Sequence, residues 1–260
     1  MARIHFLGTC SGTEPMEGMH HASLLIEAGG MNYWFDAGEN CSYRAFLSGV
    51  DVLKTRAIFL SHMHIDHTGG LADLFFCIQK MRWIKKEEVV LNNTVDIIAP
   101  DLELLHAIKS IACNNLTDHS SLKFLTHETR TFDGVVYEDG HLRVSALHNT
   151  HLGENGKNGW HAYSFLIETP DGKRTVHSGD VGEIWELDPL VDGGCDLLIM
   201  ETGHHKVREV CEYAVQKGIK RLRFHHHGRE IINNRAEMEA LVSSYPYDFS
   251  IAYDGLTEEI

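Results

Sequence analysis

A cluster of metal-binding residue types, directly after a short apolar segment, constrains the fold of this chain more than any other feature. The segment His62-Met63-His64-Ile65-Asp66-His67 holds four potential ligands within six residues. It follows Ala-Ile-Phe-Leu at residues 57–60, which is typical of a buried strand. Open α/β sheets place their functional loops at the carboxyl ends of strands. The pattern therefore predicts a metal-binding loop at the edge of such a sheet.

The spacing within this segment predicts two metal ions. His62 and His64 are two residues apart, so in an extended chain both rings project to the same side and can bind one ion. Asp66 and His67 follow where the chain turns, and we expect them to face a second ion. Imidazole and carboxylate ligands suit Zn²⁺ first and Mn²⁺ or iron as alternatives.

The His-x-His-x-Asp-His motif resembles that of the metallo-β-lactamase superfamily, and the amino-terminal half is most similar to its ribonuclease Z branch. The matching segments are FLGTCSG at residues 6–12, FDAGEN at 35–40 and IFLSH at 58–62. The resemblance implies an α/β fold of the metallo-β-lactamase type, a four-layer αββα sandwich, with a dimetal centre and hydrolytic activity. It also implies a homodimer. Asp36 matches the aspartate that orients a ligand histidine in this superfamily.

Two further ligands follow later predicted strands. After the alternating residues 142–147, His151 matches the superfamily's third histidine, and His148 is the alternative. After the strand predicted at 174–177, Asp180 in a Ser-Gly-Asp sequence matches the aspartate that bridges the two metals. One carboxylate can place an oxygen on each of two ions that lie roughly 3.5–4 Å apart.

The last ligand is predicted from strand phase. Leu222 and Phe224 alternate, and the next residue in phase is His226, with His225 as the alternative. The complete prediction assigns one ion to His62, His64 and His151, the other to Asp66, His67 and His226, and the bridge to Asp180.

Hydrolysis needs a nucleophile and a proton donor. Two cations lower the pKa of a water that they share to about 7, which makes a bridging hydroxide available at neutral pH. We count Asp66 among the catalytic residues. Ribonuclease Z relatives carry a histidine proton donor where this chain has Met200, so His204 is the predicted substitute, with His205 as the alternative.

Charge and loop length select the substrate class. The formal net charge is −14, which disfavours polyanions at long range. Only 28 residues (152–179) separate His151 from Asp180, which leaves no room for a tRNA-binding arm. We therefore predict a phosphodiesterase for a small phosphodiester. The alternatives are a tRNA 3′-end endonuclease, a hydrolase of lactones, thioesters or β-lactams, and a metal-binding sensor without turnover.

The organisation of the chain is that of one domain, residues 1–260, without linker or repeat. The six cysteines form no close pairs, and no secretory signal or apolar run of membrane length is present, so we expect a cytoplasmic protein without membrane contact. We interpret His106, His119 and His127 as surface or structural histidines. The glycine-rich loop 153–159 is interpreted as facing substrate.

Apolar periodicity predicts the regular elements. The expected helices are 41–48, 71–86, 101–113, 207–218 and 230–243. The apolar positions 71, 74, 75, 78, 81 and 84 fit a 3.6-residue period and predict the buried face of the second helix, and Asp101 is the predicted cap of the third. The expected strands are 4–7, 22–27, 32–36, 57–60, 95–100, 142–147, 162–169, 174–177, 196–201, 221–224 and 251–254. Gly29 and Gly30 predict a hairpin turn between the second and third of these strands. Residues 114–133 are polar and receive no assignment.

Overall fold

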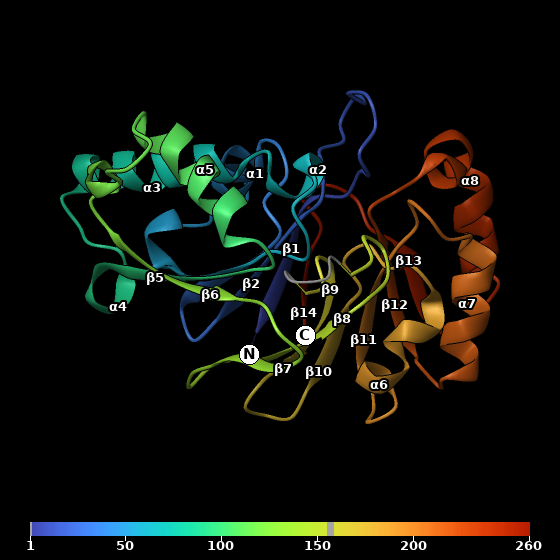
Figure 1. The fold of residues 1–260 in the computed structure, drawn as a ribbon. Coiled ribbons are helices and arrows are strands. Elements are labelled where there is room, and N and C mark those ends of the chain that lie inside the picture. The colour runs from blue at the N-terminus through green and yellow to red at the C-terminus, as the bar shows by residue number, and fades with distance from the viewer. Residues whose placement is uncertain (1, 155–158) are drawn as a thin grey trace. The chain divides into compact units, whose positions relative to one another are not determined.

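The computed structural model describes residues 2–154 and 159–260. Residues 155–158 of the predicted substrate-facing loop lie outside this part of the chain. The chain divides into two compact units, each assembled from segments that are distant in sequence (Figure 1). Unit 1 comprises Met1–Gly8, His20–Thr131 and Asp254–Glu259, and unit 2 comprises Thr9–Met19, Phe132–Tyr253 and Ile260. The single-domain organisation stays a prediction.

Unit 1 is built on a mixed seven-stranded sheet in the order β14-β1-β2-β3-β4-β5-β6. The strands are β1 (Arg3–Gly8), β2 (Ser23–Ala28), β3 (Met31–Phe35), β4 (Thr55–Phe59), β5 (Thr94–Ala99), β6 (Leu125–Arg130) and β14 (Thr257–Glu259). The pairs from β14 to β3 are antiparallel, and those from β3 to β6 are parallel. The predicted hairpin turn at Gly29 and Gly30 is present, and both residues have positive φ.

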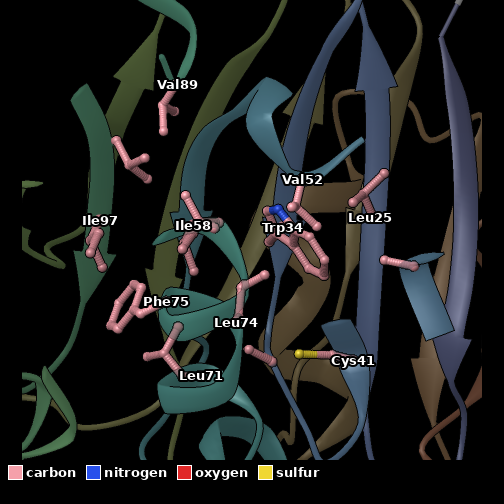
Figure 2. Packing of buried hydrophobic residues seen from close by; sticks show 14 of the residues in the cluster. Leu25, Trp34, Cys41, Val52, Ile58, Leu71, Leu74, Phe75, Val89 and Ile97 are labelled. Atoms are coloured by element: carbon pink, nitrogen blue, oxygen red, sulfur yellow. The ribbon is translucent and has the colours of Figure 1, made fainter. Parts of the chain in front are cut away.

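Helices cover this sheet and bury a continuous apolar cluster (Figures 1 and 2). They are α1 (Cys41–Leu47), α2 (Ile65–Thr68), α3 (Leu71–Lys85), α4 (Val90–Asn93) and α5 (Leu102–Cys113), with the 3₁₀ turns η1 (Val52–Lys54) and η2 (Ser120–Leu122). Trp34 of β3 lies within the cluster, where its Nε1 donates to Thr55 Oγ1 at 3.0 Å. Asp101 caps α5 as predicted, because its carboxylate accepts from the amides of Glu103 and Leu104.

The apolar face predicted for α3 is confirmed over most of its length. Leu71, Leu74 and Phe75 are buried in the cluster (Figure 2). Ile78 is buried there too, and Met81 packs against it. Ile84, the last predicted core position, is instead 62% exposed, because the cluster ends at Met81 and the final turn of the helix continues past it.

Unit 2 is built on a second mixed seven-stranded sheet in the order β13-β12-β11-β10-β9-β8-β7. The strands are β7 (Gly134–Glu138), β8 (Arg143–His148), β9 (Tyr163–Glu168), β10 (Arg174–His177), β11 (Leu197–Glu201), β12 (Arg221–His225) and β13 (Asp248–Ile251). Pairs from β7 to β10 are antiparallel, and pairs from β10 to β13 are parallel. The carboxyl ends of β10, β11 and β12 therefore meet at one edge.

A second apolar cluster joins this sheet to its helices. They are the turn η4 (Ile184–Leu187), α6 (Asp188–Val191), α7 (Val207–Gln216) and α8 (Arg229–Ser243). Gly218, at φ 70°, follows α7 and supplies the left-handed turn that ends it. Among residues 2–154 and 159–260, every helix is too short or too polar to span a bilayer.

Four strand assignments differ from expectation. The strand predicted at 251–254 is wrong: β13 ends at Ile251, and the chain passes from unit 2 to unit 1 between Tyr253 and Asp254. In unit 1, the Asp254 carboxylate accepts from the backbone amide and the Nδ1 of His20, both at 2.8 Å. Strands β6, β7 and β14 had no assignment, and all three lie at sheet edges. In β6 and β14, polar and largely exposed side chains replace the apolar pattern.

Candidate metal centre

Unit 1 gathers the four ligand types of the sequence motif at the carboxyl end of β4. His62 and His64 lie on the extended segment after this strand, and Asp66 and His67 lie in the short helix α2. The ring centroid of His62 is 4.6 Å from that of His64 and 4.1 Å from that of His67. The Nε2 of His67 is 3.5 Å from Asp66 Oδ2. The four side chains thus form one cluster within unit 1.

A buried carboxylate holds this cluster in place. Asp36 follows β3 with a left-handed backbone (φ 60°). Its oxygens accept from the backbone amide of Ser61 at 2.7 Å, the Ser61 hydroxyl at 2.8 Å and the His67 Nδ1 at 2.8 Å. Because Nδ1 of His67 donates to Asp36, its Nε2 is the nitrogen suited to bind a metal. This agrees with the orienting role predicted for Asp36.

Two glycines allow the metal-binding segment to approach the β3–α1 turn. A Cβ atom on Gly38 would lie 2.5 Å from the carbonyl oxygen of Asp66, and one on Gly70 would lie 2.1 Å from that of Gly38. The close packing is fastened by hydrogen bonds from the Ala37 amide to the His67 carbonyl (2.7 Å) and from the Gly70 amide to the Ala37 carbonyl (2.8 Å). Any larger side chain at residue 38 or 70 must displace this backbone.

Unit 2 gathers its donors around Asp180, which is buried after β10. Its Oδ2 lies 3.6 Å from His151 Nε2, and its Oδ1 lies 3.3 Å from His226 Nε2. Each oxygen of one carboxylate therefore faces the Nε2 of a different histidine. Three residues that are far apart in the sequence are brought together in this unit.

The two histidines of the 148–151 segment have different surroundings. His148 is the last residue of β8; its Nδ1 is 2.7 Å from Asp133 Oδ2, and its ring stacks on Trp160 with centroids 4.0 Å apart. His151 lies beside Asp180, and its backbone amide donates to Asn149 Oδ1 at 3.0 Å. This arrangement favours His151 over His148 as the metal ligand.

His226 reaches Asp180 by a route that strand phase did not predict. Strand β12 ends at His225, and His226 has left-handed backbone dihedrals with φ 48°. The ring of His225 packs edge-on against His177, with centroids 6.0 Å apart. A Cβ atom on Gly203 would lie 2.7 Å from His226 Nδ1, so the absence of a side chain there makes room for the ring. The left-handed turn of the backbone at His226 directs its ring toward Asp180, and the alternation of side chains along β12 does not.

Glu201 is a buried acid whose role the sequence did not indicate. It ends β11, and its carboxylate accepts from the His204 amide at 2.9 Å and from His204 Nδ1 at 3.0 Å. Burial raises the pKa of Glu201, but the hydrogen bond from His204 and the proximity of His226 outweigh burial, so the pKa is lowered overall. The same hydrogen bond raises the pKa of His204. Met200, on the opposite face of β11, is buried in the apolar cluster and offers no proton.

His204 has two chemically reasonable roles. Ligand atoms of Asp180, His204 and His226 all lie within 4.8 Å of one another, a spacing that would suit one metal ion. The side chain of His204 is also 45% exposed, as a group that contacts substrate must be. His205 differs, because its ring Nε2 is 2.9 Å from the carbonyl oxygen of Val181 and its side chain is 10% exposed.

The composition of both clusters fits divalent metal ions. The donors are imidazole nitrogens and carboxylate oxygens, the set that binds zinc, manganese or iron in hydrolases. In each unit a carboxylate hydrogen-bonds the Nδ1 of a histidine, the arrangement that fixes ligand tautomers around protein metals.

The fold is shared with solved proteins of one class. The metallo-β-lactamase fold protein YhfI from Bacillus subtilis superposes with a TM-score of 0.75 at 20% identity, covering 99% of this chain and 98% of its own. The short form of human tRNase Z superposes with a TM-score of 0.71 at 17% identity, covering 99% of each chain. The predicted metallo-β-lactamase fold, an α/β sandwich, is confirmed.

Sequence comparison then identifies the family. The model of the family described as anti-Pycsar protein Apyc1 matches residues 2–207, and the chain belongs to this family. A ribonuclease Z from Methanothermobacter thermautotrophicus is 25% identical over an alignment that covers all of this chain and 97% of the relative. The predicted resemblance to the ribonuclease Z branch is confirmed. These comparisons support a hydrolase of the metallo-β-lactamase fold.

Proposed function

We propose that this protein is a dinuclear metal-dependent phosphodiesterase that acts on a small phosphodiester. The observation that carries the proposal is the position of Asp180, each of whose oxygens faces the Nε2 of a different histidine. A carboxylate with this environment is suited to bridge two ions. The coarser conclusion, a hydrolase of this fold, is supported by the comparisons.

The proposed ligand set combines the clusters of the two units. His62, His64 and His151 would hold one ion, Asp66, His67 and His226 would hold the other, and Asp180 would be shared by both. When bound, the two ions would supply Lewis acidity and an activated water. The protein's own contribution is to fix ligand residues through Asp36 in unit 1 and Asn149 in unit 2, and to orient His204 through Glu201. These residues are positioning groups, because none of them would contact the substrate.

His204 is the proposed proton donor to the leaving alkoxide. Glu201 engages its amide and its Nδ1, so the ring is oriented and Nε2 is the nitrogen left to deliver a proton. Met200 cannot take this part, since it is buried and apolar.

Charge and connectivity favour a small substrate. The net charge of −14 disfavours long polyanions. Between His151 and Asp180, strands β9 and β10 occupy ten of the 28 residues, so a long nucleic-acid-binding insertion does not fit there. The relationship to ribonuclease Z nevertheless makes tRNA cleavage the second candidate function.

The test is hydrolysis of bis(p-nitrophenyl) phosphate by the metal-loaded protein. We expect turnover that is abolished by a chelator and by Asp180→Ala. A panel of nucleotide-sized cyclic and linear diesters, a lactone, a thioester and a precursor tRNA then assigns the substrate class. Diester turnover without tRNA cleavage is the expected result. Absence of diester turnover with two ions bound would overturn the proposal, and salt-sensitive tRNA cleavage would favour the second candidate.

The role of His204 has its own test. A proton donor matters most when the leaving group is a poor one, so His204→Ala should slow alkyl phosphodiesters much more than p-nitrophenyl esters. His205→Ala is the matched control and should show no such dependence. A loss of bound metal in His204→Ala would instead make His204 a ligand, as its distance to Asp180 and His226 permits.

A further inference from the structure

A pocket of about 530 Å³ lies in unit 1 at the carboxyl-terminal end of α3. Its volume is within the usual range of small-molecule sites, roughly 300–1,000 Å³. Its lining includes the side chains Lys80, Trp83, Lys86 and Lys123. None of these residues belongs to the metal clusters, and the pocket has no part in the proposed hydrolysis.

The pocket combines an exposed aromatic ring with positive charge. Trp83 is 79% exposed, an unusual position for a large indole that makes no use of its apolar surface in the core. Around it the lining holds four basic and two acidic residues, the latter Glu87 and Glu88, so its net charge is +2. The whole chain carries −14, so this local charge runs against the composition of the protein.

The walls of the pocket are held by specific hydrogen bonds. Gln79 and Arg82 of α3 donate to the carbonyl oxygens of Ser121 and Lys123, respectively. Asn93 Nδ2 donates to the same Lys123 carbonyl at 2.8 Å. Residues 121–123 are thereby fastened to α3 and α4. The Lys80 ammonium lies over the Phe76 ring, 4.9 Å from its centroid.

We propose that this pocket binds a mononucleotide, with the base stacked on Trp83 and the phosphate held by Lys80, Lys86 and Lys123. Base–aromatic stacking tolerates any base, because every base has a π-face. A terminal phosphate carries about −1.5 to −2 charges at neutral pH, which matches the lining charge of +2. The two glutamates oppose a longer polyphosphate or an RNA strand, whose charge exceeds what the pocket neutralises.

The test is calorimetric titration of the intact protein with AMP, a monoester that a diesterase does not cleave. Trp83→Ala and Lys80→Glu alter exposed side chains, and each should weaken binding at least about fivefold. The matched controls are Trp185→Ala, which removes another exposed indole, and Lys220→Glu, which reverses another exposed lysine; both should bind AMP as the wild type does. Binding that is insensitive to residues 80 and 83 would overturn the proposal, since AMP would then be held elsewhere.

Two further measurements are made on the wild-type chain and do not depend on how strongly a variant binds AMP. The indole N–H resonance of Trp83, assigned through Trp83→Phe, should shift on addition of AMP, and that of Trp185 should not. Inorganic phosphate should bind more weakly than AMP, and a five-nucleotide RNA should bind no more tightly. Equal affinity for phosphate would contradict the stacking, a much tighter RNA complex would contradict a mononucleotide site, and a silent Trp83 would overturn the proposal outright.

Discussion

The two donor clusters are built in different ways. In unit 1, four donors come from six consecutive residues, and the single carboxylate of Asp36 fastens the segment. In unit 2, His151, Asp180 and His226 come from segments after three different strands, and their positions depend on Asn149, Glu186 and the left-handed backbone at His226. A local cluster needs one support, whereas a dispersed cluster needs a separate support for each donor. The consequences of mutation should differ accordingly.

Asp180→Ala should have the largest effect, because the carboxylate faces both other donors of unit 2. We expect the variant to lose at least one of two bound ions and to lose hydrolysis by about 100-fold or more. Metal analysis after dialysis measures the number of bound ions, and a diester assay measures the loss of hydrolysis. Asp171→Ala, at an exposed turn of the same unit, is the control. An Asp180 variant that retains both ions would contradict the bridging role.

Asp36→Asn should weaken metal binding by about 10–100-fold, the usual effect of removing a carboxylate that orients a ligand histidine. The amide cannot accept all three hydrogen bonds from Ser61 and His67, so the free energy of unfolding should also fall by about 1–3 kcal/mol. Competition with a chelator and urea denaturation measure these changes. Asp118→Asn, at an exposed position of unit 1, should change neither quantity. Unaltered affinity in Asp36→Asn would show that the local cluster needs no such support.

Glu186→Gln should have a smaller effect, confined to one donor. The buried carboxylate accepts from the Thr150 amide at 3.1 Å and so steadies the loop that carries His151. We expect metal affinity to fall less than about tenfold, since the ligand itself is intact. Glu209→Gln on the exposed side of α7 is the matched control. A loss of metal affinity as large as that of Asp180→Ala would mean that Glu186 supports more than the loop that carries His151.

Glu128→Gln should have no effect on the metal clusters. It should change only the stability of the fold. Burial raises the pKa of this carboxyl, but hydrogen bonds from Lys109, Thr126 and His106 outweigh burial and lower it below the ordinary 4.5. A lowered folded-state pKa stabilises the protein above the unfolded pKa, and this contribution is lost as the pH falls through the folded value. Wild type should therefore exceed Glu128→Gln in unfolding free energy at pH 7, with a gap that narrows below about pH 4.5. A gap that widens on acidification would contradict the assignment.

The two clusters also differ in how far the sequence predicted them. The donors of unit 1 form a contiguous motif after an apolar strand, and the structure gathers all four in one cluster. In unit 2, only resemblance to a family selected His151 and Asp180. His226 was selected by strand alternation, which is the wrong reason, because the strand has already ended at His225.

Each feature that the sequence did not predict has a physical cause. The roles of Glu201 and Glu186 arise from contacts with backbone amides of distant loops, which no local pattern encodes. Strand β6 is polar because it lies at a sheet edge, so its composition resembles that of a loop. The exposed end of α3 continued the apolar pattern, and Ile84 was therefore assigned to a core that ends one turn earlier.

The central claim is that the two clusters together hold a coupled pair of metal ions. The most direct measurement is electron paramagnetic resonance of the protein loaded with Mn²⁺, alongside metal analysis. The account predicts two ions per chain with a spin-coupled spectrum, and replacement of either His67 in unit 1 or His226 in unit 2 by alanine should abolish the coupling. A single ion per chain, or two ions with independent spectra, would contradict it.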